Sequence, residues 1–452
     1  MAASKTATSA SAVGSPKKPL NPRTEHREFF GFPGAIGVML GTTTVLYVWY
    51  FSCNAQDGCQ LPVTKGRWMH IITSALNYQA YWNPTALKYV SLWWCWLAAL
   101  YFVLPGSRKQ GVVLRNGERL TYPINGLASF LVTVAAALAV YKSQGAGPFL
   151  WIASHFFELA FASLVFSTGM ALFVYVFSFR YSSVERPGKS VVMLALAGNS
   201  GNPVYDFFIG RELNPRIGSL DIKFFCELRP GIMGWVLLNS SFALKQYVEQ
   251  GSVSAAMWLA ILPQICYCID TLVFEENVLT TMDIVTDGFG WMLSFGDMTW
   301  VPFMYSLQAR YLVFTPVQLS TPYAAFVAVL AVVSFLVFRL SNSEKNAFRS
   351  NPEDPRIKHL KYLKTETGSR LLISGWWGMA RHINYTGDWF YGLAQCLATG
   401  FGTPMTYFFS AYFLVLLLHR NYRDECKCRD KYQKDWVRYC ELVPYLFIPY
   451  II

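Results

Sequence analysis

The chain has 452 residues, of which 53% are hydrophobic and only 14% are charged. Because soluble globular chains carry about 25% charged residues, this composition excludes an ordinary soluble protein and favours an integral membrane protein. The net charge of +11 is typical of basic cytoplasmic loops, and we expect no nucleic acid partner. The apolar runs lack strict alternation, which disfavours a transmembrane β-barrel.

The apolar runs predict an all-α polytopic membrane protein with about ten transmembrane helices. Residues 1–28 are rich in Ala, Ser, Thr, Pro and Lys, so we predict a disordered cytoplasmic tail before a membrane domain over residues 29–452. The predicted spans are residues 31–51, 84–104, 122–141, 149–179, 230–249, 253–274, 290–314, 322–340, 386–400 and 402–419.

Lysine and arginine residues are unevenly distributed among the connections and set the orientation. They concentrate in residues 17–27, 108–119, 180–189 and 345–364, which precede the first span or follow the second, fourth and eighth spans. Because an even number of spans separates these segments, they share one side, and both termini are predicted to be cytoplasmic. Cys53 and Cys59 share one loop and are able to form a disulfide if that loop is lumenal, which the sequence leaves open.

Two polar segments are too particular to be simple connections. Residues 198–231 place charges among Phe, Ile and Leu, which is typical either of a surface loop or of a loop folded against the bundle. Residues 267–310 include Asp270 and Asp297 beside apolar runs. A carboxylate in that setting must be paired or protonated, so these residues serve either a buried structural role or a polar cavity.

Two pairs of charged residues lie in the C-terminal half, each pair four residues apart on one predicted helix face. Lys345 and Arg349 form either a basic helix end or a clamp for phosphate oxygens. Arg420 and Asp424 form either a surface ion pair or a site at which a partly desolvated acid delivers a proton. Since no glycine-rich dinucleotide fingerprint occurs, a nucleotide would need a site built from helix side chains.

Two further features have plain alternatives. Trp376 and Trp377 are either residues of an interfacial aromatic belt or rings that stack on a planar ligand. Cys426 and Cys428 lie near His419, but their spacing fits no common zinc pattern, so we expect no metal.

Four long motifs stand at these segments: Gly-Arg-Glu-Leu-Asn-Pro-Arg at 210–216, Leu-Leu-Ile-Ser-Gly-Trp-Trp-Gly at 371–378, Arg-His-x-Asn-Tyr-x-Gly-Asp at 381–388, and Arg-Asp-Glu at 423–425. With them the chain resembles, from about residue 30 onward, the sterol reductase family of the endoplasmic reticulum, which includes the lamin B receptor membrane domain. Within that family, the stretches 227–230, 287–290 and 306–310 resemble the C14 branch.

The resemblance implies a ten-helix enzyme of the endoplasmic reticulum membrane that uses NADPH, with a cytoplasmic-side cofactor pocket formed by roughly residues 253–452. It implies that Lys345 and Arg349 bind the adenosine phosphates and that Asp424 donates the proton. Tyr267 is then the hydrogen-bonding partner of Asp424. The remaining residues that it places around the cofactor are Leu372, Trp377, Asn384, Tyr385, Arg420, Asp424 itself, Cys428, Arg429, Asp430, Lys431, Tyr432 and Tyr439.

The activity implied by the resemblance is reduction of the C14–C15 double bond of a sterol 8,14-diene that enters from the bilayer. Reduction at C7 by the same machinery and a catalytically silent sterol-binding protein are the alternatives. A secondary transporter would need symmetric halves, which we do not find. Ile383, Thr386 and the Asn421-Tyr422 pair depart from the residues common in the C14 branch, which affects substrate detail more than activity.

Overall fold

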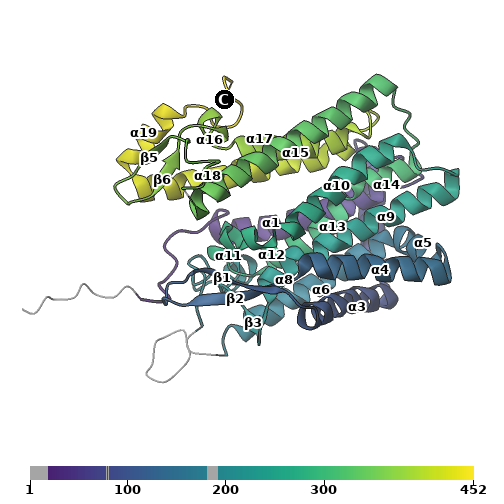
Figure 1. The fold of residues 1–452 in the computed structure, drawn as a ribbon. Helices are drawn as coiled ribbons and strands as arrows, with labels where there is room; N and C mark the ends of the chain where they lie inside the picture. Colours follow the sequence, from purple (N-terminus) through teal and green to yellow (C-terminus); the bar gives the residue numbers. More distant parts are fainter. Residues whose placement is uncertain (1–18, 78, 80, 181–191, 352, 452) are drawn as a thin grey trace, which may run out of the picture.

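The computed structural model describes residues 19–451 apart from residues 78, 80, 181–191 and 352. These residues form a bundle of helices that run side by side (Figure 1). Six of the described helices are long and apolar enough to cross a membrane: α1 (Gly31–Ser52), α3 (Pro84–Val103), α4 (Gly126–Gln144), α6 (Phe156–Phe177), α10 (Ala255–Val273) and α15 (Thr321–Ser350). Four of the basic residues used to predict the orientation, Lys17, Lys18, Arg186 and Lys189, lie outside the described residues.

Several predicted spans are not single long apolar helices. His155 ends α5 (Gly147–Ser154) and begins α6, so the predicted span 149–179 is two helices. The predicted span 290–314 is broken into α12 (Trp291–Phe295), the π-helical turn η3 (Gly296–Trp300), α13 (Val301–Met304) and α14 (Leu307–Phe314). The fifth, ninth and tenth correspond to α9 (Pro230–Gln250), α17 (Ile383–Leu397) and α18 (Phe408–Tyr432).

Short elements decorate the bundle and include strands that an all-α prediction omits. Three antiparallel hairpins pair β1 (Ser107–Val113) with β2 (Arg119–Ile124), β3 (Arg216–Ile217) with β4 (Leu220–Asp221), and β5 (Tyr362–Lys364) with β6 (Arg370–Leu372). The short helices are α2 (Lys65–Leu76), α7 (Pro203–Ile209), α8 (Ile222–Leu228), η2 (Glu275–Thr280), α11 (Met282–Val285), α16 (Trp376–Met379), η4 (Met405–Tyr407) and α19 (Lys434–Leu442). The hairpins, α11 and α19 lie toward one end of the bundle (Figure 1).

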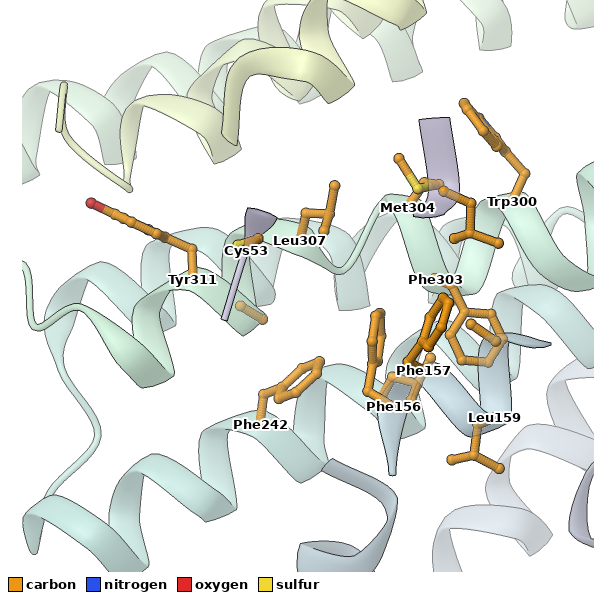
Figure 2. Packing of buried hydrophobic residues seen from close by; sticks show 14 of the residues in the cluster. Cys53, Phe156, Phe157, Leu159, Phe242, Trp300, Phe303, Met304, Leu307 and Tyr311 are labelled. Atoms are coloured by element: carbon orange, nitrogen blue, oxygen red, sulfur yellow. The ribbon is translucent and has the colours of Figure 1, made fainter. Parts of the chain in front are cut away.

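Aromatic side chains dominate the core where α6 meets α1, α9 and α13. The ring of Phe157 stacks on that of Tyr50, with centroids 3.7 Å apart. Phe156 contacts the rings of Phe242 and Phe303 at 5.4 Å and 5.3 Å (Figure 2). Because large aromatic rings bury much apolar area in specific edge and stacked geometries, they fix how these helices pack.

Residues 19–28 differ from the predicted disordered tail. The side chain of Asn21 donates a hydrogen bond to the carbonyl oxygen of Val192 at 2.8 Å. The backbone N–H of Glu28 donates to the hydroxyl of Tyr205 at 2.9 Å. This segment is therefore fixed on the bundle by hydrogen bonds to a distant loop, which the composition of the segment alone does not indicate; the rest of the predicted tail, residues 1–18, lies outside the described residues.

Cys53 and Cys59 are joined by a disulfide, which settles the alternative that the sequence left open. Two hydrogen bonds tie the same loop to the C-terminal half. The Arg310 side chain donates to the carbonyl oxygen of Cys53 at 3.0 Å, and the Thr403 hydroxyl donates to that of Cys59 at 2.5 Å. The loop thus links the end of α1 to α14 and to the segment before η4.

A fully buried ion pair joins the residue before α9 to the start of η2, just after α10. The guanidinium of Arg229 lies 2.7 Å from a carboxylate oxygen of Glu275, and both side chains are completely buried. Arg229 also donates to Asn125, and Glu275 accepts from the backbone N–H of Gly126, so the start of α4 joins the cluster. Neutralising one member of such a pair leaves an uncompensated buried charge.

We predict that Glu275→Gln lowers the free energy of unfolding by about 3–5 kcal/mol, because Arg229 loses its counter-ion. Thermal unfolding of the purified protein in detergent measures the change. The matched control is Glu276→Gln, because Glu276 pairs with Lys109 at 2.6 Å on the exposed surface. Exposed pairs contribute at most about 1 kcal/mol. Equal shifts of the unfolding temperature in the two variants would contradict the prediction.

Candidate functional site

The predicted site residues come from α10 and from α15, β6, α16, α17, α18 and α19 (Figure 1). The C-terminal tail runs along the start of α17 and holds it. The backbone N–H groups of Arg381 and His382 donate to the carbonyl oxygens of Tyr445 and Leu446 at 2.9 Å and 2.8 Å. These hydrogen bonds fix the segment that carries the Arg-His-x-Asn-Tyr motif.

Lys345 and Trp377 lie together at the end of α15. The ammonium of Lys345 is 3.6 Å from the centroid of the buried Trp377 ring, and the indole N–H of Trp377 donates to the carbonyl oxygen of Ser341 at 2.8 Å. Trp377 is therefore buried beneath a cation rather than placed in an exposed aromatic belt. Among the described residues neither Lys345 nor Arg349 forms an ion pair. Two neighbouring cations without carboxylate partners are suited to bind phosphate oxygens.

Asp424 lies beside a histidine that the sequence reasoning did not assign to the site. One carboxylate oxygen of Asp424 is 3.9 Å from His382 Nε2 and 3.9 Å from the sulfur of Cys428. His382 is buried and its ring stacks on that of Tyr385, with centroids 4.8 Å apart. The only signal for His382 in the sequence is its place in the Arg-His-x-Asn-Tyr motif.

Arg420 does not pair with Asp424, although the two residues are one helical turn apart. Its guanidinium lies 2.6 Å from a carboxylate oxygen of Asp283, on α11. Of the two interpretations that the spacing allowed, the surface ion pair between Arg420 and Asp424 is therefore wrong. The carboxylate of Asp424 stays free of an arginine partner and is 39% exposed.

Tyr267 lies on α10 and faces α17. Its ring centroid is 6.5 Å from that of Tyr391 and 6.0 Å from that of Phe338. The structure gives no hydrogen bond between Tyr267 and Asp424, both of which it describes.

The remaining predicted residues divide into an inner and an outer group. Leu372 and Tyr439 are buried, and the side-chain amide of Asn384 donates to Asn342 at 3.3 Å. Tyr432 is partly buried against the cluster that contains Tyr439. The residues that lie exposed on the outside of α18 are Arg429, Asp430 and Lys431. The structure thus buries part of one face of α18 and leaves the opposite face exposed.

Together these features define a class: a polytopic helical membrane protein with two adjacent cations, a carboxylate without an arginine partner, and buried aromatic rings at one end of the bundle. The sequence profile of the ergosterol biosynthesis ERG4/ERG24 family matches residues 23–452. The chain belongs to this family of sterol-pathway membrane proteins.

Several curated relatives match most of this chain. It is 46% identical to "Delta(14)-sterol reductase erg24" of Schizosaccharomyces pombe over 426 residues, which cover 94% of this chain and 97% of the relative. It is 49% identical to "Delta(14)-sterol reductase" of Ascobolus immersus over 80% of this chain and 84% of the relative. It is 45% identical to "Delta(14)-sterol reductase TM7SF2" of Mus musculus over 82% and 86% of the two chains.

The environment of His382 predicts a dependence of stability on pH. Burial, and then the positive charges of Lys345 and Arg381, lower the pKa of His382 to about 3. The unfolded chain binds this proton near the ordinary pKa of about 6.5, so His382 destabilises the fold progressively as the pH falls from about 6.5 toward 3. We expect His382→Gln to lessen the drop in unfolding temperature between pH 7.5 and pH 5, measured in detergent. An unchanged drop would contradict this.

Proposed function

We propose that this chain reduces the C14–C15 double bond of sterol 8,14-dienes with NADPH. The observation that carries the proposal is the nearly full-length similarity to relatives that bear the name delta(14)-sterol reductase. The free carboxylate of Asp424 and the unpaired cations of Lys345 and Arg349 supply the groups that such a reaction needs. Their presence together disfavours the alternative of a catalytically silent sterol-binding protein.

The residues present fit NADPH. We place the adenosine phosphates on Lys345 and Arg349, which have no carboxylate partner in the part of the chain that the structure describes. The residues proposed to line the rest of the cofactor site are Leu372, Trp377, Asn384, Tyr385, Arg420, Cys428, Arg429, Asp430, Lys431, Tyr432 and Tyr439. When bound, NADPH supplies the hydride that the reduction consumes.

Asp424 is the proposed acid. An isolated alkene is too weak an electrophile to accept a hydride, so protonation at C15 comes first and leaves positive charge at C14. We propose that Asp424 delivers this proton, and its partial exposure allows water to reprotonate it after each turnover. Tyr267, on the neighbouring α10, is proposed as the partner that orients the acid during the reaction.

We propose that the chain crosses the endoplasmic reticulum membrane about ten times, with both termini in the cytoplasm. Four further crossings, α9, the α12–α14 segment, α17 and α18, would join the six long apolar helices. The N-terminal segment supports termini on one side, because Glu28 lies 3.1 Å from Arg423 of α18. The sterol is proposed to enter from the bilayer, since it partitions strongly into lipid.

The deciding experiment measures turnover by the purified protein with NADPH. A sterol 8,14-diene and a 7-dehydrosterol are supplied in parallel, and the products are identified by mass spectrometry. Reduction of the 8,14-diene supports the proposal. Reduction of the 7-dehydrosterol alone supports the C7 alternative, and turnover of neither supports a silent sterol-binding protein.

For the cofactor, we expect the wild-type protein to show a marked preference for NADPH over NADH. Arg349→Ala is expected to raise the KM for NADPH by roughly ten- to a hundredfold, because a charged contact with phosphate is lost. Steady-state kinetics with both cofactors measure the change. Arg356→Ala is the matched control, because Arg356 is exposed and already pairs with Asp354 at 2.6 Å. Equal use of the two cofactors by the wild-type protein would reject the phosphate clamp.

For the acid, we expect Asp424→Asn to lower kcat by about 10²–10⁴-fold while NADPH binding survives, because the amide keeps the shape but donates no acidic proton. Turnover of the 8,14-diene and NADPH affinity are measured on the same preparation, with Asp354→Asn as the control. Near-normal turnover rejects Asp424 as the acid. A joint loss of turnover and affinity assigns it to cofactor binding instead.

A further inference from the structure

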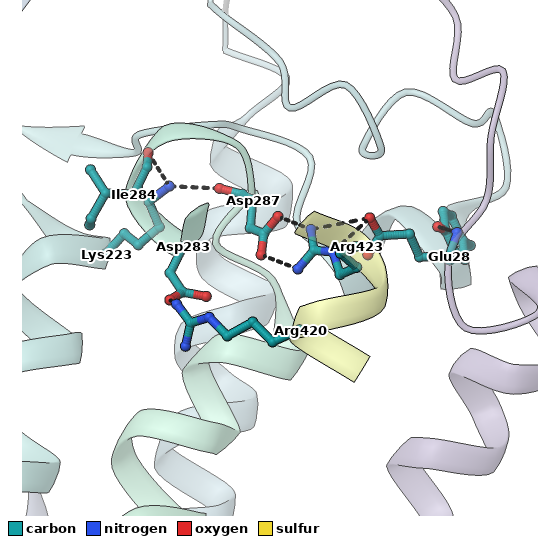
Figure 3. Close-up of polar contacts among 8 residues, drawn as sticks. Glu28, Lys223, Asp283, Ile284, Asp287, Arg420 and Arg423 are labelled. Carbon is teal, nitrogen blue, oxygen red and sulfur yellow. Dashed lines mark hydrogen bonds and ion pairs between the residues drawn. The ribbon is translucent and has the colours of Figure 1, made fainter. Parts of the chain in front are cut away.

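Two arginines of α18 are held by carboxylates of one short segment, residues 282–287. The guanidinium of Arg420 lies 2.6 Å from Asp283. The guanidinium of Arg423 binds both carboxylate oxygens of Asp287, at 2.6 Å and 3.0 Å (Figure 3). Because Arg420 and Arg423 are three residues apart, they project from the same side of the helix. The segment therefore grips α18 at two points, one of them bidentate.

The gripping segment is itself anchored from behind. The ammonium of Lys223, a completely buried side chain, donates to the carbonyl oxygens of Ile284 and Asp287 at 2.9 Å and 2.6 Å (Figure 3). These contacts use the backbone of the segment, so the carboxylates of Asp283 and Asp287 remain available to α18. A buried cation with oxygen partners cannot move without losing them, which makes the segment a rigid support.

Glu28 closes the cluster from the N-terminal side. Its carboxylate lies 3.1 Å from Arg423, whose side chain is only 16% exposed. The side chain of Asp287 is 6% exposed and that of Glu28 is 22% exposed. Arg423 is thus held between two carboxylates in a partly buried setting, where ion pairs are screened less than on the surface.

Asp424 has no comparable anchor of its own. Its nearest polar contacts within the described part of the chain are the two at 3.9 Å, to His382 and Cys428. The direction of its carboxylate therefore depends on the backbone of α18. Arg423, the preceding residue, ties that part of the helix to Asp287 and Glu28.

We propose that Asp287 and Asp283 are positioning residues for the reaction, an inference that rests on the proposed function. Asp287 acts through Arg423 and sets the place of the Asp424 carboxylate. Asp283 acts through Arg420 and sets the place of a guanidinium of the cofactor pocket. Neither carboxylate needs to touch the sterol or NADPH.

The two positions have different kinetic signatures. Asp287→Asn is expected to lower kcat by roughly ten- to a hundredfold, because small displacements of a catalytic group carry losses of that size. The KM for NADPH stays within about twofold in that variant, since the phosphate clamp is untouched. Asp283→Asn raises the KM for NADPH by about fivefold or more and lowers kcat less. A general loss of folded protein does not produce this split.

A native thiol reports the position of α18 without turnover. Burial, and then the charge of Asp424, raise the pKa of the Cys428 thiol to about 12, so it reacts slowly. In the protein without cofactor, Asp287→Asn is expected to speed maleimide labelling of Cys428 by about threefold or more. Once its ion pair is lost, this part of α18 separates from its neighbours more often and exposes the thiol. Cys426, exposed on the same helix, is the internal standard and keeps its rate. Peptide mass spectrometry resolves the two sites.

Glu276→Gln is the matched control variant, because Glu276 precedes the same segment but pairs, among the described residues, only with exposed Lys109. It is expected to keep wild-type kcat, KM and labelling. If Asp287→Asn does not fold, Glu28→Gln decides. That variant loosens Arg423 from the other side and is expected to lower kcat by about two- to tenfold and to speed Cys428 labelling.

The proposal is overturned if folded Asp287→Asn keeps both the wild-type labelling rate of Cys428 and the wild-type kcat. If Asp287→Asn does not fold, the same result in Glu28→Gln overturns it. So does an equal change in Glu276→Gln. If the wild-type protein reduces no 8,14-diene, the proposed function fails, but the labelling of Cys428 still shows whether Asp287 fixes α18. The two failures are thus distinguishable.

Discussion

A guanidinium group that leaves water needs hydrogen-bond acceptors, and a carboxylate that meets this need shapes the end of the bundle that carries the site. Arg229 satisfies it with Glu275 at 2.7 Å, fully buried, and thereby joins the start of α9 to the start of η2. Arg420 and Arg423 satisfy it with Asp283 and Asp287. Because an unpartnered buried charge is costly, each pair forces a loop and a helix together. The loops between spans are consequently part of the support of the site.

The site itself uses the opposite condition. Lys345 lies over an aromatic ring and has no carboxylate within ion-pair distance among the described residues. Asp424, on α18, does not pair with it. A cation left in this state keeps its capacity to bind an anion, and an unpaired carboxylate keeps its capacity to hold a proton. The contrast between matched and unmatched charges distinguishes the supporting ion pairs from Lys345 and Asp424, the residues proposed to bind phosphate and to donate the proton.

Close helix packing brings these groups within reach of one another. A side chain at Gly387 would overlap the backbone of α15 at Phe338, so α17 approaches α15 closely only because this residue is glycine. The C-terminal tail then pairs with Arg381 and His382 and fixes the start of α17. The arrangement of the candidate site therefore depends on backbone contacts as well as on charged side chains.

Composition and periodicity already determined the class of the protein, because apolar runs of span length have few alternatives to membrane helices. Helical spacing placed Lys345 and Arg349 on one face, and the motifs indicated the family. Spacing also put Arg420 within reach of Asp424, yet the structure pairs Arg420 with Asp283, 137 residues away in the sequence. The contact of His382 with Asp424 and the support of Asp287 by Lys223 arose in the same way, from packing between distant segments. Local sequence sets which face of a helix a residue occupies, but the neighbour on that face depends on how all the helices pack together.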